Sequence, residues 1–531
     1  MKTSPLQQLP LGISTFFTIR NEGYIYVDKT ENIYNLIQQG KRYFLSRPRR
    51  FGKSLLVSTL KEILAGNKSL FKDLWIEKSD YTWQPHGVIS LSLSGLGIKD
   101  ADSLVTGLLS VLFDIAQSYE FVIQSTHTAN PERALSYLVK ALHKRFGKVA
   151  ILIDEYDYPI LKMLDDQKKA IEMRDSLHDF FSAIKDLDEY ISFVFITGVS
   201  AFAKAGVFSG LNNLTTMTLD SRWAAICGYT DQEIDLYFAP YIQAWANKHK
   251  VSYGELRLQI KNWYNGYHFG ADVTAVYNPF SVMHAFDKQN YENFWLQSGP
   301  PSFLIKEIQK NYRIIEKEML HLKPFEVLAD FLSIFDIGSV PLVSLLFQSG
   351  YLTITHFDEE KWAYTLDYPN YEVRTAMEQY LLSVFTQTDI HQIRDFVLNL
   401  WTAFKEKNIA EIVALIKSKI TQVPYQTHIK EEQFYHGLLH ALCSTAGLKV
   451  YSEFMTSHGR IDMVVELSSV SYVIELKFNQ TAEKALQQIE DRKYYEVLQD
   501  QNKSIVLLGL NFHRKPNEFD ISYASKEIKK S

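Results

Sequence analysis

Residues 47–54 read Arg-Pro-Arg-Arg-Phe-Gly-Lys-Ser, and they give the strongest signal in the N-terminal part of the chain. A short strand-like run, 43–46, precedes them, and apolar residues recur at helical spacing over 55–64. The sequence therefore predicts a strand, a tight loop and a helix, with Gly-Lys-Ser at the start of the helix. Unpaired backbone N–H groups and the helix dipole make that end a site for an anion.

In this position Lys53 can reach the outer phosphates of a nucleotide, and the Ser54 hydroxyl can bind Mg²⁺. The usual phosphate loop has a Gly five positions before the Gly of this motif, where this chain has Arg47, so the motif is degenerate. Gly-Lys-Ser alone also occurs by chance in surface loops, but the flanking strand and helix favour a phosphate loop (P-loop). We expect ATP to bind there, in contact with Arg49, Arg50, Phe51, Gly52, Lys53 and Ser54.

Two later strands end in polar residues that suit the same site. The apolar run 149–153 ends in Asp154 and Glu155. Asp154 can hold the water shell of Mg²⁺, and Glu155 can polarise the attacking water. The run 191–196 ends in Thr197, which can sense the terminal phosphate at the carboxyl end of a parallel sheet. The alternatives are an acidic turn after a core strand and an ordinary threonine at a strand end.

These motifs resemble a known family. R-P-R-R-F-G-K-S, I-L-I-D-E-Y-D and F-I-T-G-V-S with F-S-G-L-N-N are similar to segments of the prokaryotic AAA-ATPase-like proteins. Members of that family carry a restriction-endonuclease-like PD-(D/E)xK nuclease domain at the C-terminus. The resemblance implies a P-loop ATPase core of the additional-strand type, and a P-loop without its first Gly is typical of the family.

Composition narrows the class of protein. The 531 residues are 46% hydrophobic and 22% charged, as in ordinary globular proteins, and the net charge of −5 means that nucleic acid could be bound only by a local patch. Two cysteines, Cys227 and Cys443, give no disulfide framework and fit a reducing cytoplasm. The N-terminus does not read as a signal peptide. Residues 191–210 read as a buried strand and a loop, so we expect no membrane span.

The pattern of expected strands and helices changes along the chain and suggests three parts. Residues 1–225 alternate strands and helices, which predicts an α/β domain with a parallel sheet. Residues 226–400 are mainly helical. Their aromatic turn 262–269 could stack on bases or simply pack in a loop. A helix, a turn and a strand over 337–352, followed by a hairpin, could form a winged-helix lid. Residues 401–531 form a separate α/β pattern.

The last part has the element order α-β-β-β-α-β. Its expected elements are 431–445, 448–454, 460–466, 471–478, 481–498 and 504–510. This order resembles the core of the PD-(D/E)xK nucleases.

Three side chains of this part form a candidate nuclease site. Asp462 starts the second strand, and Glu475 and Lys477 lie two residues apart on the third, so they share one face. The two carboxylates can bind a divalent cation, and Lys477 can orient water or offset charge on the phosphate. The resemblance adds Gln488, on the following helix, and Glu432, an acidic residue of the first helix that could extend the metal shell.

Several further residues have competing interpretations. His436 and His440 share a helix face, but no third zinc ligand is evident, which favours a partly buried face. The arginines around the P-loop could contact the triphosphate, a neighbouring subunit, or acidic residues at the edge of the sheet. No arginine finger can be assigned, although Arg222 is a candidate.

The resulting hypothesis is a cytoplasmic α/β protein with a P-loop ATPase, a helical or winged-helix middle region, and a restriction-endonuclease-like α/β domain. Its expected activity is ATP-regulated, Mg²⁺-dependent cleavage of nucleic acid, DNA rather than RNA, and it could form a homo-oligomer. One alternative is a nucleotide-operated switch that binds a partner without cleavage. Another is an ATPase that remodels proteins and uses the nuclease fold only for binding.

Overall fold

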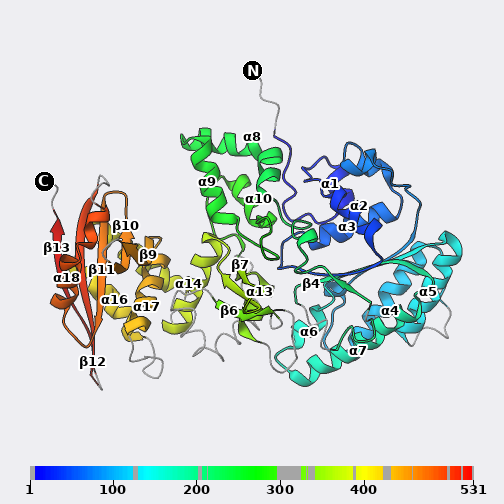
Figure 1. Ribbon diagram of the computed structural model, residues 1–531. Helices are drawn as coiled ribbons and strands as arrows, with labels where there is room; N and C mark the ends of the chain where they lie inside the picture. The colour runs from blue at the N-terminus through cyan, green and yellow to red at the C-terminus, as the bar shows by residue number, and fades with distance from the viewer. Residues whose placement is uncertain are drawn as a thin grey trace. The chain divides into compact units, whose positions relative to one another are not determined.

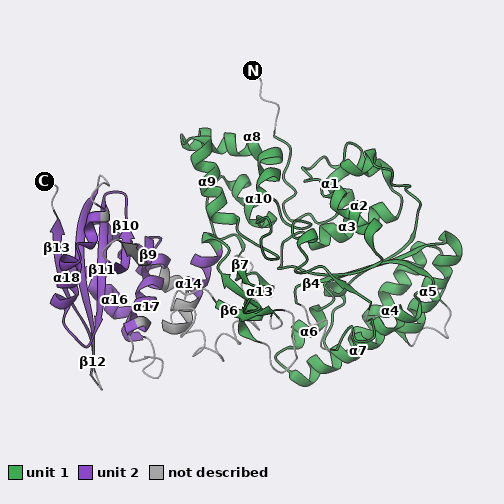
Figure 2. Ribbon diagram, viewed as in Figure 1, with its two compact units in different colours: residues 1–305, 325–372 green, residues 306–324, 373–531 purple. Residues whose placement is uncertain are grey.

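The computed structural model describes residues 6–123, 130–200, 206–211, 213–295, 325–329, 332, 341–386, 390–422, 432–456, 459–498, 503–515 and 518–528. The chain forms two compact units (Figure 2). Unit 1 contains residues 1–305 and 325–372, and unit 2 contains residues 306–324 and 373–531. The predicted borders near residues 225 and 400 stay predictions.

Unit 1 is built on a five-stranded parallel sheet (Figure 1). Its strands are β1 (Arg42–Ser46), β2 (Gly87–Ser92), β3 (Val149–Asp154), β4 (Ile191–Gly198) and β5 (Thr215–Thr216). Their order in the sheet is β2-β3-β4-β1-β5, and every neighbouring pair is parallel. β4 thus lies between β1, which leads into the P-loop, and β3, which confirms the expected additional-strand core.

Helices cover both faces of this sheet. Figure 1 shows α1 (Phe16–Asn21), α2 (Thr30–Gln39) and α3 (Lys53–Leu64) on one side, and α4 (Ala101–Ser118), α5 (Pro131–Phe146), α6 (Tyr158–Met163) and α7 (Gln167–Asp186) on the other. The helical pattern expected over 101–146 is therefore two helices. Each of them begins at a capping side chain, Asp100 for α4 and Asn130 for α5, which accepts hydrogen bonds from the first turn.

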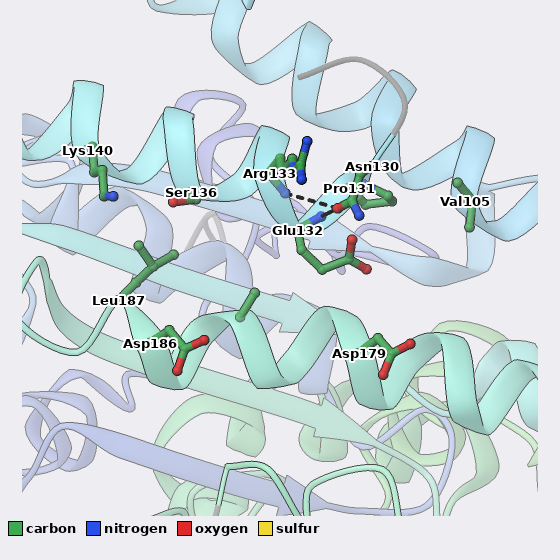
Figure 3. Close-up of a pocket in the computed structure, with 11 residues that line it drawn as sticks. Val105, Asn130, Pro131, Glu132, Arg133, Ser136, Lys140, Asp179, Asp186 and Leu187 are labelled. Atoms are coloured by element: carbon green, nitrogen blue, oxygen red, sulfur yellow. Dashed lines mark hydrogen bonds between the residues drawn. The ribbon is translucent and has the colours of Figure 1, made fainter. Parts of the chain in front are cut away.

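A pocket lies between α4, α5 and α7 (Figure 3). Acidic and basic side chains both line it: Glu132, Arg133 and Lys140 from α5, and Asp179 and Asp186 from α7. None of the eleven lining residues belongs to the sites predicted from the sequence.

The described residues of unit 1 from 226 to 372, which we call the lid, contain helices and a small sheet. Its helices are α8 (Asp231–His249), α9 (Tyr253–Tyr264), α10 (Pro279–Lys288) and α13 (Leu342–Ser349). Its strands are β6 (Phe325–Leu328), β7 (Thr353–Asp358) and β8 (Ala363–Asp367), in the antiparallel order β6-β8-β7. The expected helix and hairpin are present as α13 and β7–β8, and residues 337–340 of that prediction lie outside the described residues.

The lid is mainly helical, as predicted, and its aromatic turn is packed. Tyr264 and Tyr267 are buried, and Tyr264 belongs to an apolar core formed with α8 and α10. The interpretation of 262–269 as a packed aromatic loop therefore fits better than an open platform for bases. Within the described residues, no helix has the length and apolar character needed to cross a bilayer.

Unit 2 contains a five-stranded mixed sheet with helices. Three helices come first: α14 (Tyr371–Thr386), α15 (Ile390–Lys405) and α16 (Ile409–Gln422). The elements that follow are, in order, α17 (Glu432–Thr445), β9 (Lys449–Thr456), β10 (Gly459–Glu466), β11 (Val470–Phe478), α18 (Ala482–Asp491), β12 (Ser504–Lys515) and β13 (Glu518–Ile528). The sheet order is β13-β12-β11-β10-β9, and among the neighbouring pairs described here β11–β12 is the parallel one. The expected α-β-β-β-α-β order is confirmed.

Two details of unit 2 differ from the prediction. The helix expected over 481–498 ends at Asp491, and a short 3₁₀ turn follows over 494–498. The final strand continues to Lys515 and pairs with an additional antiparallel strand, β13. β13 was missed because its central residues alternate apolar and polar side chains without a long apolar run.

Gly509 on β12 lets α18 approach the sheet. It lies in register with Glu475 of β11. A Cβ atom at this position would be 2.4 Å from the carbonyl oxygen of Ala482 and 2.6 Å from the backbone nitrogen of Leu486, both in α18. The helix backbone thus occupies the space that any other side chain would need.

Candidate functional sites

The P-loop joins β1 to α3 and ends at Gly52, the N-cap of α3. Gly52 has a φ of 90°, in the left-handed region where a residue without Cβ is favoured. Its carbonyl oxygen accepts the first helical bond, from the nitrogen of Leu56 at 2.9 Å. The N–H groups of the first turn are therefore free of helical partners, as an anion site requires.

Lys53 lies in the interior of this loop, with 6% of its surface exposed. Its Nζ donates hydrogen bonds to the carbonyl oxygens of Arg47 and Pro48, each at 2.9 Å. Burial lowers the pKa of Lys53, and the charges of Asp154 and Asp157 oppose that change. The ammonium group thus lies where loop carbonyls and carboxylates converge.

Asp154 ends β3 beside the start of α3. It is 7% exposed. Burial raises its pKa, and the nearby Ser54 hydroxyl and the charge of Lys53 oppose the rise. A hydroxyl and a carboxylate close together are a donor set that fits Mg²⁺. Glu155 follows with a φ of 52°, so the chain turns sharply after the strand.

Asp157 is a site residue that our sequence analysis did not single out. Its Oδ2 accepts hydrogen bonds from the nitrogens of Val199 and Ser200, at 3.0 and 2.7 Å, and from the Ser200 hydroxyl at 2.5 Å. The carboxylate therefore ties the turn after β3 to the loop after β4. The available signal was the second acidic residue of the Asp-Glu-Tyr-Asp run, but its partner loop lies over forty residues away.

Thr197 is the penultimate residue of β4. Its side chain is fully buried, and its Oγ1 has no hydrogen-bond partner among the described residues. Its carbonyl oxygen accepts a bond from the nitrogen of Tyr156 at 3.1 Å, so β4 is fixed against the turn that carries Glu155. Its role toward a terminal phosphate stays a prediction.

The arginines of the P-loop have different surroundings. Arg47, which replaces the usual Gly, is buried and donates to the carbonyl oxygens of Ser46, Thr218 and Trp223. It is therefore a structural residue in this loop, neither exposed to a phosphate nor paired with an acid. Arg49 is exposed, and the Cζ of Arg50 lies 3.7 Å from the centre of the Phe280 ring.

Two further arginines form ion pairs. Arg42 pairs with Asp188, as the interpretation of salt bridges at the sheet predicts for this residue. Arg222 is largely exposed, and it pairs with Asp220 at 2.5 Å. Nothing in these contacts distinguishes Arg222 as an arginine finger.

The predicted nuclease residues meet on β10 and β11 of unit 2. Oδ2 of Asp462 accepts a hydrogen bond from the nitrogen of Leu476 at 2.9 Å. Oε1 of Glu475 accepts bonds from Lys477, at 3.3 Å, and from the side-chain amide of Gln488 on α18. Glu475, Lys477 and Gln488 are therefore joined by hydrogen bonds, and Asp462, held by the backbone of Leu476, lies close enough for its charge to act on Glu475.

Burial disfavours the charged form of Glu475 in this set, because the residue is only 1% exposed. Burial raises its pKa to about 7, the charge of Asp462 adds to the rise, and Lys477 opposes it. Its Oε2 is buried and has no hydrogen-bond partner in the described part of the chain. A buried, unpartnered carboxylate oxygen beside a second carboxylate fits a divalent cation, which would supply the missing positive charge.

Glu432 of α17 lies near the same residues. Burial raises its pKa, Lys477 opposes the rise and Asp462 adds to it. In the described part of the chain, however, no three acidic, histidine or cysteine side chains converge closely enough to form a ready metal cluster. A cation would thus depend on Asp462 and Glu475, and the place of Glu432 in its shell stays a prediction.

His436 and His440 both contact protein groups, as expected for a partly buried helix face. Nε2 of His436 is 2.7 Å from the carbonyl oxygen of Asp462. Nδ1 of His440 is 2.7 Å from the Ser452 hydroxyl, and its Nε2 is 3.5 Å from Glu378. His436 therefore contacts the backbone of β10 at Asp462 itself.

The raised pKa of Glu475 predicts a pH-dependent stability. Ionising this buried carboxyl disfavours the folded state, so the free energy of unfolding should fall as pH rises from about 4.5 through about 7. In chelator, Glu475→Gln should match the parent at pH 5 and be more stable at pH 8, by up to about 3 kcal/mol. Denaturant titrations of the full chain measure this. The control is Glu466→Gln, at the last residue of the neighbouring strand β10. Parallel pH profiles for Glu475→Gln and the parent would contradict the raised pKa of Glu475.

Comparisons with known proteins identify both domains. A model of the predicted AAA-ATPases matches residues 10–208, and a model of the PD-(D/E)XK nuclease superfamily matches residues 430–519. An uncharacterized protein in the vnfD 5′ region of Azotobacter chroococcum mcd 1 is 36% identical over 528 residues, which span 96% of this chain and 97% of that protein.

Solved structures show weaker similarity. A Walker-type ATPase of Pyrococcus abyssi is 12% identical, with a TM-score of 0.34, over 67% of this chain and 97% of its own. The ORC1 protein of Aeropyrum pernix, in complex with DNA, is 13% identical, with a TM-score of 0.26, over 67% of this chain and 93% of its own. The two domain models and the near full-length relative place the chain in a family: it belongs to the AAA-ATPase-like proteins with a C-terminal PD-(D/E)XK nuclease superfamily domain.

Proposed function

We propose that this chain is an ATP-regulated, metal-dependent nuclease that acts on DNA rather than RNA. The observation that carries the proposal is the placement of Glu475, which bonds to Lys477 and Gln488 beside Asp462, while its buried Oε2 has no hydrogen-bond partner among the described residues. A purely structural acid at this position would be expected to have both oxygens satisfied. The nuclease superfamily match supports nucleic acid as the substrate.

In the proposed nucleotide site, the backbone N–H groups of the P-loop, from Arg49 to Ser54, would hold the ATP phosphates. Lys53, which now donates to two loop carbonyls, would contact the negatively charged outer phosphates. Ser54 and Asp154 would hold Mg²⁺, which neutralises charge on the phosphates. Glu155 would orient the attacking water.

In the proposed nuclease site, Asp462 and Glu475 would hold a divalent cation, with Glu432 near its shell. When bound, the cation activates water and draws charge from the scissile phosphate. Lys477 is placed by Glu475 to orient that water or to offset charge on the phosphate. Gln488 positions the carboxylate of Glu475 through its amide.

The nucleotide site is tested by Lys53→Ala. Loss of a buried charge-assisted contact should weaken ATP binding on the order of 10- to 100-fold. Glu155→Gln should keep most of the affinity and lose hydrolysis, because it alters only the group that acts on water. Calorimetry and phosphate release measure the two effects. Lys61→Ala, at an exposed lysine of the same helix, is the control. Parent-like affinity in Lys53→Ala would exclude the P-loop assignment.

The nuclease site is tested by Asp462→Asn and Glu475→Gln. Each variant should reduce cleavage to the level of a protein-free control, because the cation loses one of its two carboxylates. The assay incubates plasmid DNA, oligonucleotide DNA and RNA with the protein, in Mg²⁺ and in chelator. Glu466→Gln again serves as the matched control on β10. Cleavage that survives in both variants would place the site elsewhere, and inactivity of the parent on every substrate would favour a binding role.

Regulation is tested by combining the two sites. ATP can shift cleavage only by binding two states of the protein with different affinities. Glu155→Gln, which keeps ATP bound, should therefore lie at one extreme of the cleavage rate, and Lys53→Ala at the other. By linkage, DNA should alter ATP affinity by the same factor as ATP alters DNA affinity. Equal cleavage rates in the parent and both variants, over a range of ATP concentrations, would show that the two domains are only tethered.

A further inference from the structure

Three polar side chains from three different elements of unit 2 contact one another: Glu378 of α14, His440 of α17 and Ser452 of β9. Nδ1 of His440 lies 2.7 Å from the Ser452 hydroxyl, and its Nε2 lies 3.5 Å from Oε1 of Glu378. Glu378 and His440 are both buried, and Ser452 is half-buried. Because each ring nitrogen of His440 faces a polar group on a different element, the ring is fixed between α14 and β9.

Stability alone does not account for these contacts. Oε2 of Glu378 is buried and has no hydrogen-bond partner among the described residues. Replacing a buried carboxyl group and its partner by well-packed apolar side chains is often neutral or stabilising. A buried polar network does, however, hold its elements in one arrangement, because a displaced arrangement leaves polar groups without partners. The contacts of His440 therefore point to a positional role.

The helix α17 contacts both strands beside the proposed nuclease site. Ser452, which faces His440, lies in register with Met463 of β10, the residue that follows Asp462. His436 lies four residues before His440 on the same face of α17. Its Nε2 donates to the carbonyl oxygen of Asp462 at 2.7 Å. The two histidines thus hold β9 at Ser452 and β10 at Asp462.

The side chain of Asp462 has an anchor of its own. Its Oδ2 accepts a hydrogen bond from the nitrogen of Leu476 at 2.9 Å, and Leu476 follows Glu475 on β11. The backbone of Asp462 is therefore held by α17, and its carboxylate is held by the strand that carries Glu475. A divalent cation shared by two carboxylates tolerates only small displacements of either one. The position of α17 against the strands consequently matters for the cation.

We infer that His440 is a positioning residue of the proposed nuclease site. Fixed by Glu378 on one side, it fixes α17 against β9 on the other. The position of α17 in turn sets the place of Asp462 through His436. His440 acts only through these groups and has no contact with the cation or the substrate. The inference rests on the proposed metal-dependent function, which it deepens.

The test replaces the buried pair by apolar side chains of similar size, in the Glu378→Met/His440→Leu variant of the full chain. The variant should be at least as resistant to denaturant as the parent, because the carboxyl group and its partner are removed together. Its affinity for Mn²⁺, measured by calorimetry, should nevertheless fall on the order of 10-fold, as is typical when groups behind metal ligands are removed. In plasmid cleavage, kcat should fall with little change in KM. A purely structural role would not lower metal affinity in a stable variant.

Two variants of His436 test the last step while Glu378 and His440 stay in place. His436→Leu removes the donor to the Asp462 carbonyl and should lower Mn²⁺ affinity to a similar extent. His436→Gln should retain the affinity, because its amide can donate to the same carbonyl oxygen. The control is Ser444→Ala, at a buried residue one turn after His440 on α17, which should match the parent.

The outcomes separate the inference from the function on which it rests. Parent-like Mn²⁺ affinity in the pair replacement, together with loss of binding in Asp462→Asn, would overturn the inference and leave the metal site intact. Equal losses in Ser444→Ala would also overturn it, because they would indicate a general effect of altering α17. If the pair replacement does not fold, the His436 variants decide, and equal affinities of the two would contradict the inference. A parent that binds no Mn²⁺ would refute the proposed metal site and this inference with it.

Discussion

The arrangement of unit 1 around the P-loop depends on how the protein compensates the buried ammonium group of Lys53. A charge removed from water must be compensated by polar groups, and here the compensation comes from two loop carbonyls and from the carboxylates of Asp154 and Asp157. Those groups belong to the loop after β1 and the turn after β3. The insertion of β4 between the two strands sets their separation. The sheet order, the loop and the acidic turn are thus parts of one electrostatic arrangement.

Unit 2 also contains a buried charge that the protein compensates only in part, but this charge is negative. Glu475 is buried beside Asp462, and Lys477 and Gln488 satisfy only one of its oxygens. In the proposed function, an anion completes the first site and a cation completes the second. Each unit therefore contains a buried charge whose compensation by the protein leaves room for a ligand.

The sequence predicted those features that depend on local pattern. An unbroken apolar run marked β3, a run interrupted only by Ser192 marked β4, and the two-residue spacing of Glu475 and Lys477 marked one face of β11. Features that depend on distant contacts were missed. Nothing near Arg47 indicates that its guanidinium contacts carbonyl groups over 170 residues away, and nothing near Glu372 indicates burial against Trp295. The link between Asp157 and Ser200 is equally nonlocal.

Gly509 limits the amino-acid substitutions that this domain can accept. It has no chemical function, yet it sets the depth at which α18 rests on the sheet, directly across from Glu475. A methyl group there would lift the helix and draw Gln488 away from the carboxylate that it contacts. Position 509 should therefore tolerate as few residues as the positions of the proposed nuclease site, although Gly509 contributes only an absence of volume. Inactivating substitutions in this domain need not map to its polar residues.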